Sequence, residues 1–336
     1  MNRQYRLTLL LIAAGTALLH AQSIGSVRSG NGERPRIEKA ENGLLISWAD
    51  SNVGVPAGSD RDNPDAGQVD IWDEHGRPLV SFNVLHLMDE ARAVYISDVS
   101  ARLGGVIAVA AVYAGKEGDD KVPPAPALLI FGFGGQLQSA YALDDTHGIR
   151  KLAVDEQSNI WTLTENFEDS DPLDAPMIVE YAADGRVVRE LVPRRELWSG
   201  GATPKEGFYL GRITMGAEGG VAWVWLPGST DLITISASDG KIARAQTGLP
   251  TREKHREDPV DVFREPSGDV TAVVREDAQD GTSELSYYAW SEVSGKWSRF
   301  TPGTCDGGRL LGVSSLGQIY LRFKDSEADI CAFRRQ

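Results

Sequence analysis

Three histidines and a set of oxygen-bearing side chains are the residues whose types could do chemistry. His86, His147 and His255 each stand near acidic residues, and three converging imidazoles could bind a metal ion or act as a base. Histidines in loops are more often bystanders, so they do not by themselves indicate an active site. Carboxylates and an amide could also hold a divalent metal, and the candidates are Glu90, Asp145, Asn166, Glu257 and Asp306.

One further segment carries alternating oxygen ligands. Asp60 and Asp62 lie in the run DRDNPD, which faintly resembles a calcium loop. The run lacks the glycine and the distant glutamate of an EF-hand, so a solvated acidic loop is the simpler interpretation. The sequence therefore indicates no cofactor other than Ca²⁺, and only weakly.

An arginine stands near the start of the first strand in five of the six repeated units described below. A ring of arginines could hold a carboxylate or a phosphate. Side chains alternate sides along a strand, and the spacings to the following turn differ in parity, so all five cannot face one way. Pairing with nearby acidic loops is the alternative. Trp198, beside Ser199-Gly200-Gly201, is a candidate for stacking on a ligand. The five arginines are Arg36, Arg92, Arg150, Arg212 and Arg309.

No motif in the chain fixes an activity. The nucleophile elbow G-x-S-x-G, the P-loop, the zinc motif H-E-x-x-H and the dinucleotide fingerprint are all missing. Acidic residues outnumber basic ones by 48 to 34, which gives a net charge of −14. Phosphate backbones need basic surfaces, so the charge argues against general nucleic-acid binding.

The N-terminus resembles a secretory signal peptide over residues 1–21. Arg3 and Arg6 precede an uncharged apolar run, and Ala21 supplies a small residue at the cleavage position. A membrane anchor is the alternative, but the run is shorter than the ~20 residues that span a bilayer. We expect a protein exported to the periplasm or medium of a bacterium, with no membrane-spanning segment after cleavage.

Only two cysteines occur, Cys305 and Cys331. In an exported protein they can pair, and closing the loop between them would contribute roughly 3 kcal/mol of stability. Two buried thiols are the alternative. We expect the disulfide.

Turn residues and alternating strands reveal an internal repeat. Two kinds of turn alternate strictly along the chain, and each joins two strands of period two. Each unit has about 50 residues and four antiparallel strands, which is typical of a propeller blade. The first turns lie at Gly43, Gly105, Ser158-Asn159, Gly219-Gly220, Gly268 and Gly317, and the second at Gly76, Gly135, Gly185, Gly240 and Gly295.

The repeat predicts an all-β fold, a single six-bladed β-propeller over residues 22–336. The last unit lacks its fourth strand, so we expect residues 23–29 to supply it and close the ring. The predicted blades span approximately 36–85, 91–143, 148–193, 208–247, 259–301 and 308–334 plus 23–29.

The repeat and its Asp-Gly turns, Asp184-Gly185 and Asp239-Gly240, resemble the six-bladed β-propeller superfamily of NHL-like, TolB-like and lactonase-like proteins. The resemblance covers the mature chain and implies a fold. It does not imply one function, because members of such superfamilies include binding modules, lactonases and quinone-dependent dehydrogenases.

The long loops between the second and third strands are acidic and would lie on one face. Loops on a rigid scaffold commonly carry function. We therefore expect a monomeric, non-catalytic propeller that binds a protein or a small ligand through this face. The alternative is a metal-dependent lactonase-like hydrolase or a sugar-oxidising enzyme with its site at the channel mouth. The acidic loops span 49–67, 113–127, 164–176, 275–284 and 324–329.

Overall fold

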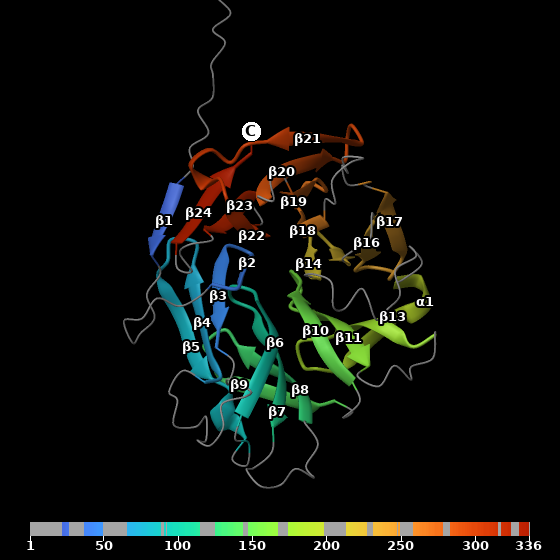
Figure 1. Ribbon diagram of the computed structural model, residues 1–336. Coiled ribbons are helices and arrows are strands. Elements are labelled where there is room, and N and C mark those ends of the chain that lie inside the picture. The colour runs from blue at the N-terminus through green and yellow to red at the C-terminus, as the bar shows by residue number, and fades with distance from the viewer. Residues whose placement is uncertain are drawn as a thin grey trace, which may run out of the picture.

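The computed structural model shows an all-β protein. It describes residues 22–26, 37–49, 66–88, 91, 93–114, 125–143, 147–166, 174–197, 213–226, 231–246, 248, 258–277, 283–314, 317–323 and 329–335. Within these residues the chain forms six antiparallel sheets of four strands each. The sheets stand as blades around a central channel, with their first strands innermost (Figure 1). The fold is a six-bladed β-propeller, as the repeat predicts.

The strands of each blade follow one another outward from the channel. Blade 1 has β2 (Lys39–Glu41), β3 (Leu44–Trp48), β4 (Gln68–Asp73) and β5 (Pro78–Asn83), and blade 2 has β6 (Ala93–Ala101), β7 (Val106–Ala114), β8 (Ala125–Gly132) and β9 (Leu137–Ala142). Blade 3 has β10 (His147–Val154), β11 (Ile160–Asn166), β12 (Pro176–Tyr181) and β13 (Val187–Pro193), and blade 4 has β14 (Thr214–Glu218), β15 (Val221–Trp225), β16 (Asp231–Ser236) and β17 (Ile242–Gln246). Blade 5 has β18 (Asp258–Arg264), β19 (Val270–Asp277), β20 (Ser283–Ser291) and β21 (Lys296–Phe300). Blade 6 has β22 (Gly308–Val313), β23 (Gln318–Phe323), β24 (Asp329–Arg334) and β1 (Gln22–Ser26), and the short helices are η2 (Leu85–Leu87), α1 (Arg194–Leu197) and η3 (Gly303–Cys305).

The N-terminal strand closes the ring. β1 pairs antiparallel with β24, with Ser23 opposite Cys331, so the two ends of the chain share one sheet (Figure 1). This confirms that the sixth blade takes its outer strand from the N-terminus. The closure gives β24 a hydrogen-bonding partner in place of an open edge.

A disulfide braces the same blade. Cys305 and Cys331 are paired, with their Cα atoms 5.6 Å apart, which confirms the expected bond. Cys305 ends η3, just before the inner strand, and Cys331 lies in β24. The bond therefore ties the segment entering the blade to its third strand.

The core lies between neighbouring blades rather than inside one layer. Strand side chains alternate between the two faces of a sheet, and each face packs on the next blade. Ile71 of blade 1 and Val109 of blade 2 belong to one buried cluster. Trp72 packs between blades 1 and 6, and Trp161 between blades 3 and 4. Large buried aromatic rings thus fill the wedges between diverging sheets.

The outer turns also fit one blade to the next. Gly185, in the turn before β13, has φ +79°, and a Cβ there would overlap the Tyr141 ring of blade 2. Glycine is needed at this turn both for its backbone conformation and for the close approach of Tyr141.

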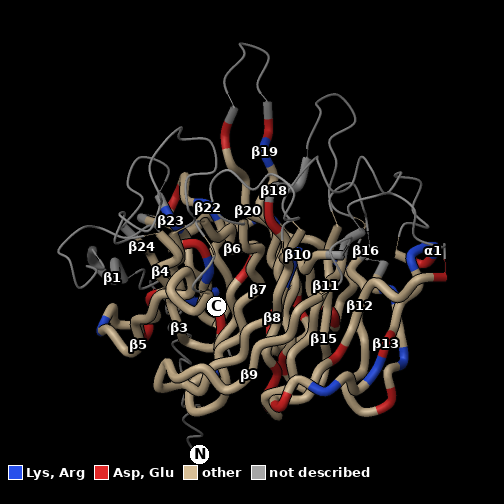
Figure 2. Tube along the Cα trace, turned by 90° about the horizontal axis from the view of Figure 1, so that it is seen from below, with Lys and Arg blue, Asp and Glu red and all other residues tan. Residues whose placement is uncertain are grey.

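The tight turns gather on one face of the ring. In the side view the strands stand next to one another, and charged residues of both signs lie along the lower edge below β13 and β15 (Figure 2). Asp184 and Arg186 lie in the tight turn between β12 and β13, where the Arg186 amide donates to Asp184 Oδ1. Among the described residues, no helix is long and apolar enough to cross a membrane.

Candidate functional site

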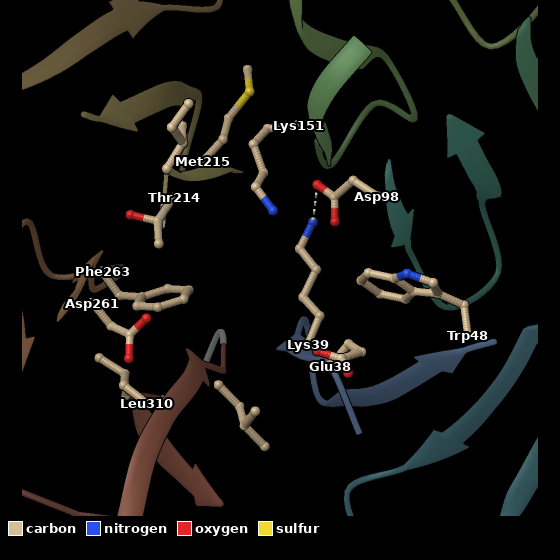
Figure 3. Close-up of a pocket in the computed structure, with 12 residues that line it drawn as sticks. Glu38, Lys39, Trp48, Asp98, Lys151, Thr214, Met215, Asp261, Phe263 and Leu310 are labelled. Atoms are coloured by element: carbon tan, nitrogen blue, oxygen red, sulfur yellow. Dashed lines mark hydrogen bonds and ion pairs between the residues drawn. The ribbon is translucent and has the colours of Figure 1, made fainter. Parts of the chain in front are cut away.

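The central channel holds a cavity that all six blades line. Its volume is about 180 Å³, similar to a cavity of about 150 Å³ that can admit benzene. The close-up shows two lysines, the Asp98 carboxylate and several apolar side chains around it (Figure 3). The lining residues are Glu38, Lys39, Trp48, Asp98, Lys151, Ile213, Thr214, Met215, Asp261, Phe263, Leu310 and Leu311.

The cavity lies on the side of the channel where the inner strands begin. Each inner strand ends at a tight turn, so its start faces the longer connections. Thr214 begins β14 and Lys39 begins β2, and both line the cavity. A second cavity of about 30 Å³ is lined instead by last residues of inner strands, such as Glu218 and Arg264. The larger cavity is therefore the one nearer the loop face.

A β-bulge in several inner strands sets which residues face the channel. The register shifts by one residue between Ile96 and Asp98, and again between Ile149 and Lys151. The inner strand of blade 5 has the same shift just before Asp261. A bulge adds one residue and reverses the inside–outside alternation beyond it. Asp98, Lys151 and Asp261 each follow a bulge directly, and all three line the cavity.

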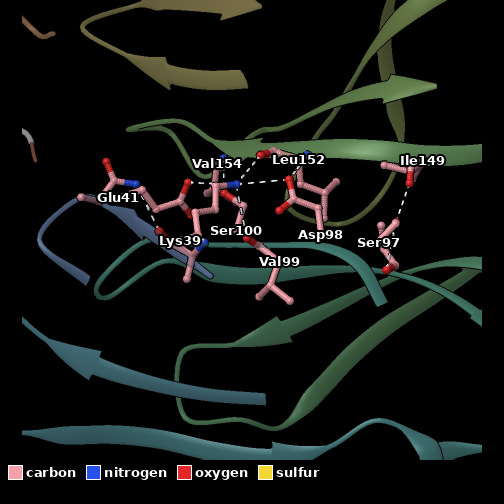
Figure 4. A network of polar contacts seen from close by, with 12 residues as sticks. Lys39, Glu41, Ser97, Asp98, Val99, Ser100, Ile149, Leu152 and Val154 are labelled. Atoms are coloured by element: carbon pink, nitrogen blue, oxygen red, sulfur yellow. Dashed lines mark hydrogen bonds and ion pairs between the residues drawn. The ribbon is translucent and has the colours of Figure 1, made fainter. Parts of the chain in front are cut away.

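Lys39 is the centre of a buried polar network (Figure 4). Its Nζ donates to Asp98 Oδ2 at 3.3 Å, to the Val99 carbonyl at 3.2 Å and to the Leu152 carbonyl at 2.8 Å. Glu41 Oε2 lies 3.2 Å from the same nitrogen. One ammonium thus joins the inner strands of blades 1, 2 and 3.

The network also satisfies backbone groups that the sheets leave open. An inner strand has a hydrogen-bonding partner on one side only, so its other edge needs partners. Asp98 Oδ2 accepts from the Leu152 amide at 2.7 Å, and Ser100 Oγ accepts from the Val154 amide at 2.9 Å. On the far side of the channel, Thr214 Oγ1 donates to the Val262 carbonyl. Polar side chains of one blade therefore complete the inner edge of the next.

Burial and pairing act in opposite directions on this network. Burial by itself lowers the pKa of Lys39, but Asp98 and Glu41 outweigh it and hold the pKa above its ordinary value. Burial raises the pKa of Glu41, against the opposing effect of the Lys39 ammonium. Lys39 is therefore a charged, fully engaged group, and its role in the channel is structural.

Lys151 and Asp98 each leave a polar atom of the lining without a partner among the described residues. Lys151 Nζ has no hydrogen bond or ion pair within the described part of the chain, and its ammonium points into the cavity (Figure 3). Asp98 Oδ1 is buried and finds no partner among the described residues. A buried acceptor without a donor costs about 1–3 kcal/mol, so these atoms favour a water or ligand that bonds to them.

The remaining surface of the cavity is largely apolar. Ile213, Met215 and Leu310 are buried side chains of blades 4 and 6, and Phe263 comes from blade 5. A few converging polar groups on an apolar wall are typical of a small-molecule site.

The smaller cavity near the tight turns carries a titrating carboxylate. Burial, and then the nearby charge of Glu156, raise the pKa of Glu218 to about 7. Glu156 Oε1 accepts from the Gly219 amide at 2.6 Å, and its Oε2 has no partner in the described region. Glu218 therefore changes its charge near neutral pH.

Most of the residues singled out from the sequence lie where nothing is described. His86 is exposed on η2, and Asp306 is exposed after η3. Arg150 and Arg309 lie in inner strands but are not among the cavity-lining residues. His147 and Asn166 are described in their backbone only. Outside the described residues lie Arg36, Arg92, Arg212, His255, Trp198, Glu90, Asp145, Glu257, Asp60 and Asp62, so the arginine ring and the metal set stay predictions.

Within the described residues, no group of three or more His, Cys, Asp or Glu side chains is placed to hold a metal ion. The channel residues Lys39, Asp98, Lys151 and Asp261 were not predicted from the sequence. Asp98 and Asp261 share one signal, an acidic residue between apolar residues of an inner strand, as in ISDVSA and PVDVFR. A charged side chain in such a strand indicates either a buried ion pair or a ligand-binding site.

Comparison with known proteins finds only distant likeness to solved structures. No family of known proteins and no curated protein matches the chain. A protein of unknown function from Bacteroides caccae is 11% identical, with 82% of this chain and 81% of that chain covered and a TM-score of 0.43. A chain of the mitotic checkpoint complex is 10% identical over 99% of both chains, with a TM-score of 0.47. The GH74 enzyme of Niastella koreensis is 10% identical, with 90% of this chain and 42% of that chain covered and a TM-score of 0.47. Likeness at this level says nothing about ligand or activity.

Proposed function

We propose that this protein is an exported, non-catalytic propeller that binds a small ligand in the loop-side cavity of its channel. The observation that carries the proposal is the ammonium of Lys151, which has no hydrogen bond or ion pair among the described residues and faces a cavity lined by all six blades. A site built on inner strands is rigid, and a rigid site can hold a ligand without a large ordering cost.

The size of the cavity favours a small ligand over a protein partner. About 180 Å³ is slightly more than the cavity of about 150 Å³ that admits benzene, so the space suits a small molecule. A protein partner would need an interface of about 800 Å² on each side. The acidic loops lie mostly outside the described residues, so the binding role expected of them stays a prediction.

Export is part of the proposal. The leader at residues 1–21 and the Cys305–Cys331 disulfide support it, because disulfides persist in oxidising compartments. We propose a periplasmic or extracellular location in a bacterium, and the leader-like residues 1–21 support it. Locating the protein in fractionated cells, with the N-terminus sequenced after purification, tests this part directly.

The binding function is tested by thermal melts of the purified protein with a panel of small carboxylic acids, amines, amino acids and lactones, each with and without Ca²⁺. A ligand that binds only the folded state raises the melting temperature. We expect at least one compound to do so and to be recovered unchanged by mass spectrometry. Ile213→Trp, which fills the cavity, should abolish the effect. Turnover of any lactone, or an effect that survives Ile213→Trp, would contradict the proposal.

A further inference from the structure

The charges around the cavity select a class of ligand. Lys39 is already shared between Asp98 and Glu41, so that network carries one more acid than base. Asp261, only 1% exposed, adds a further carboxylate to the lining, and Lys151 adds one ammonium. A ligand with a single negative charge would meet Lys151 but also the neighbouring acids.

The two polar atoms without a partner among the described residues also favour a ligand that carries both charges. Lys151 Nζ is a donor and needs an acceptor, whereas Asp98 Oδ1 is an acceptor and needs a donor. Both residues project from neighbouring blades toward the same space (Figure 3). A molecule that carries a carboxylate and an ammonium close together satisfies both atoms at once. Charge-assisted hydrogen bonds of this kind are about twice as strong as neutral ones.

The apolar side chains of the lining indicate what the rest of the ligand should be. Met215, Phe263 and Leu310 line the part of the cavity formed by blades 4, 5 and 6, and in the close-up Met215 lies beside Lys151 (Figure 3). An aliphatic side chain of about four carbon atoms would fill this space and displace water from apolar surface.

We propose that the cavity binds a free aliphatic α-amino acid, with its carboxylate on Lys151, its ammonium toward the Asp98 and Asp261 carboxylates, and its side chain on the apolar wall. This inference rests on the proposed binding function and narrows it to one ligand class. It involves no chemical step.

Calorimetric titration with three matched probes tests the inference. Leucine has both charged groups, 4-methylpentanoic acid lacks the ammonium, and 3-methylbutylamine lacks the carboxylate. We expect leucine to bind at least tenfold more tightly than either analogue. Equal binding of the acid would mean an anion site, and equal binding of the amine a cation site, and each result would overturn the amino-acid assignment.

Two variants of Lys151 test whether leucine binds in the cavity. Lys151→Met, at a half-buried position, removes the ammonium that would hold the ligand's carboxylate. It should weaken the binding of leucine at least tenfold and leave the binding of the amine unchanged. Lys151→Arg should restore part of the leucine affinity. The control Lys296→Met, at an exposed lysine in β21, should change nothing. Leucine binding that is insensitive to Lys151→Met would overturn the inference.

Failure of the inference and failure of the proposed function give different results. If leucine does not bind but another compound of the panel does, and Ile213→Trp abolishes that binding, the amino-acid class is wrong and the binding function stands. If no compound of the panel binds in the cavity, both fail.

Discussion

The ammonium of Lys39 lies 3.3 Å from Asp98 Oδ2, so the inner strands of blades 1 and 2 are joined by an ion pair buried in the channel. The same ammonium reaches the Leu152 carbonyl of blade 3 at 2.8 Å. Neighbouring blades also meet through apolar side chains, which have no preferred direction. The ion pair therefore helps to fix how the inner edges of three blades meet. Among the described lining residues, it leaves Lys151 as the cation without a protein partner.

Replacing Lys39 by methionine should lower the free energy of unfolding by about 3–5 kcal/mol, because it leaves two buried carboxylates without their cation. Chemical denaturation of the two proteins measures the difference. Lys296→Met, at an exposed lysine, is the control and should stay within about 0.5 kcal/mol of the parent.

A second substitution tests why Lys39→Met should lose stability. Adding Asp98→Asn to Lys39→Met removes one of the stranded charges and should recover part of the stability. If the double variant is as unstable as the sum of the two single variants, the ion pair does not couple these residues.

Stability should depend on pH through Glu218. Its pKa in the folded protein is raised from the ordinary 4.5 to about 7, mainly by burial and then by Glu156. The protonated carboxyl therefore stabilises the fold at low pH, and this stabilisation is lost as the pH rises through about 7.

Glu218→Gln should remove that dependence. At pH 8 the variant should be more stable than the parent by about 1 kcal/mol, a value reduced for the partial exposure of the carboxyl. Melting temperatures between pH 5 and 8 measure the effect. A parent and a variant with parallel pH profiles would show that Glu218 does not titrate in this range.

The disulfide should stabilise the sixth blade. Replacing Cys305 and Cys331 by serine should lower the free energy of unfolding by roughly 3 kcal/mol, because the bond closes a loop of about 25 residues in the unfolded chain. Denaturant titration of the oxidised parent, the reduced parent and the double serine variant measures this. Reduced parent and double variant should agree, and a reduced parent as stable as the oxidised one would contradict the expectation.

Ring closure should protect the third strand of the sixth blade. Without residues 22–26, the Ser23–Cys331 pairing is lost and β24 becomes an edge strand. Hydrogen exchange should then accelerate in β24 and stay unchanged in β20, which has its own partners on both sides. Unchanged exchange in β24 would mean that β1 does not close the ring.

Much of the fold could be predicted from the sequence because the turns repeat. Gly185 and Gly240 stand at equivalent turns of successive blades, and both have positive φ. The last repeat lacks a fourth strand, which predicted its pairing with an N-terminal strand. The two cysteines predicted the disulfide in the same blade. These features are local, or follow from counting strands.

The channel site could not be predicted in the same way. The expectation for inward-facing residues counted positions from the turn with strict alternation, and the bulges before Asp98 and Lys151 reverse that alternation. In blade 3 the register shift falls at Arg150, and Lys151 rather than Arg150 lines the cavity. Which of two adjacent cations faces the channel depends on a bulge that the sequence does not mark.

The measurement that tests the central claim most directly is a crystal structure of the protein grown with leucine, beside one grown without it. The account predicts electron density for the amino acid in the channel cavity, with its carboxylate on Lys151 Nζ and its ammonium near Asp98 Oδ1. Density for solvent alone in the cavity, with leucine bound elsewhere or not at all at saturating concentration, would contradict it.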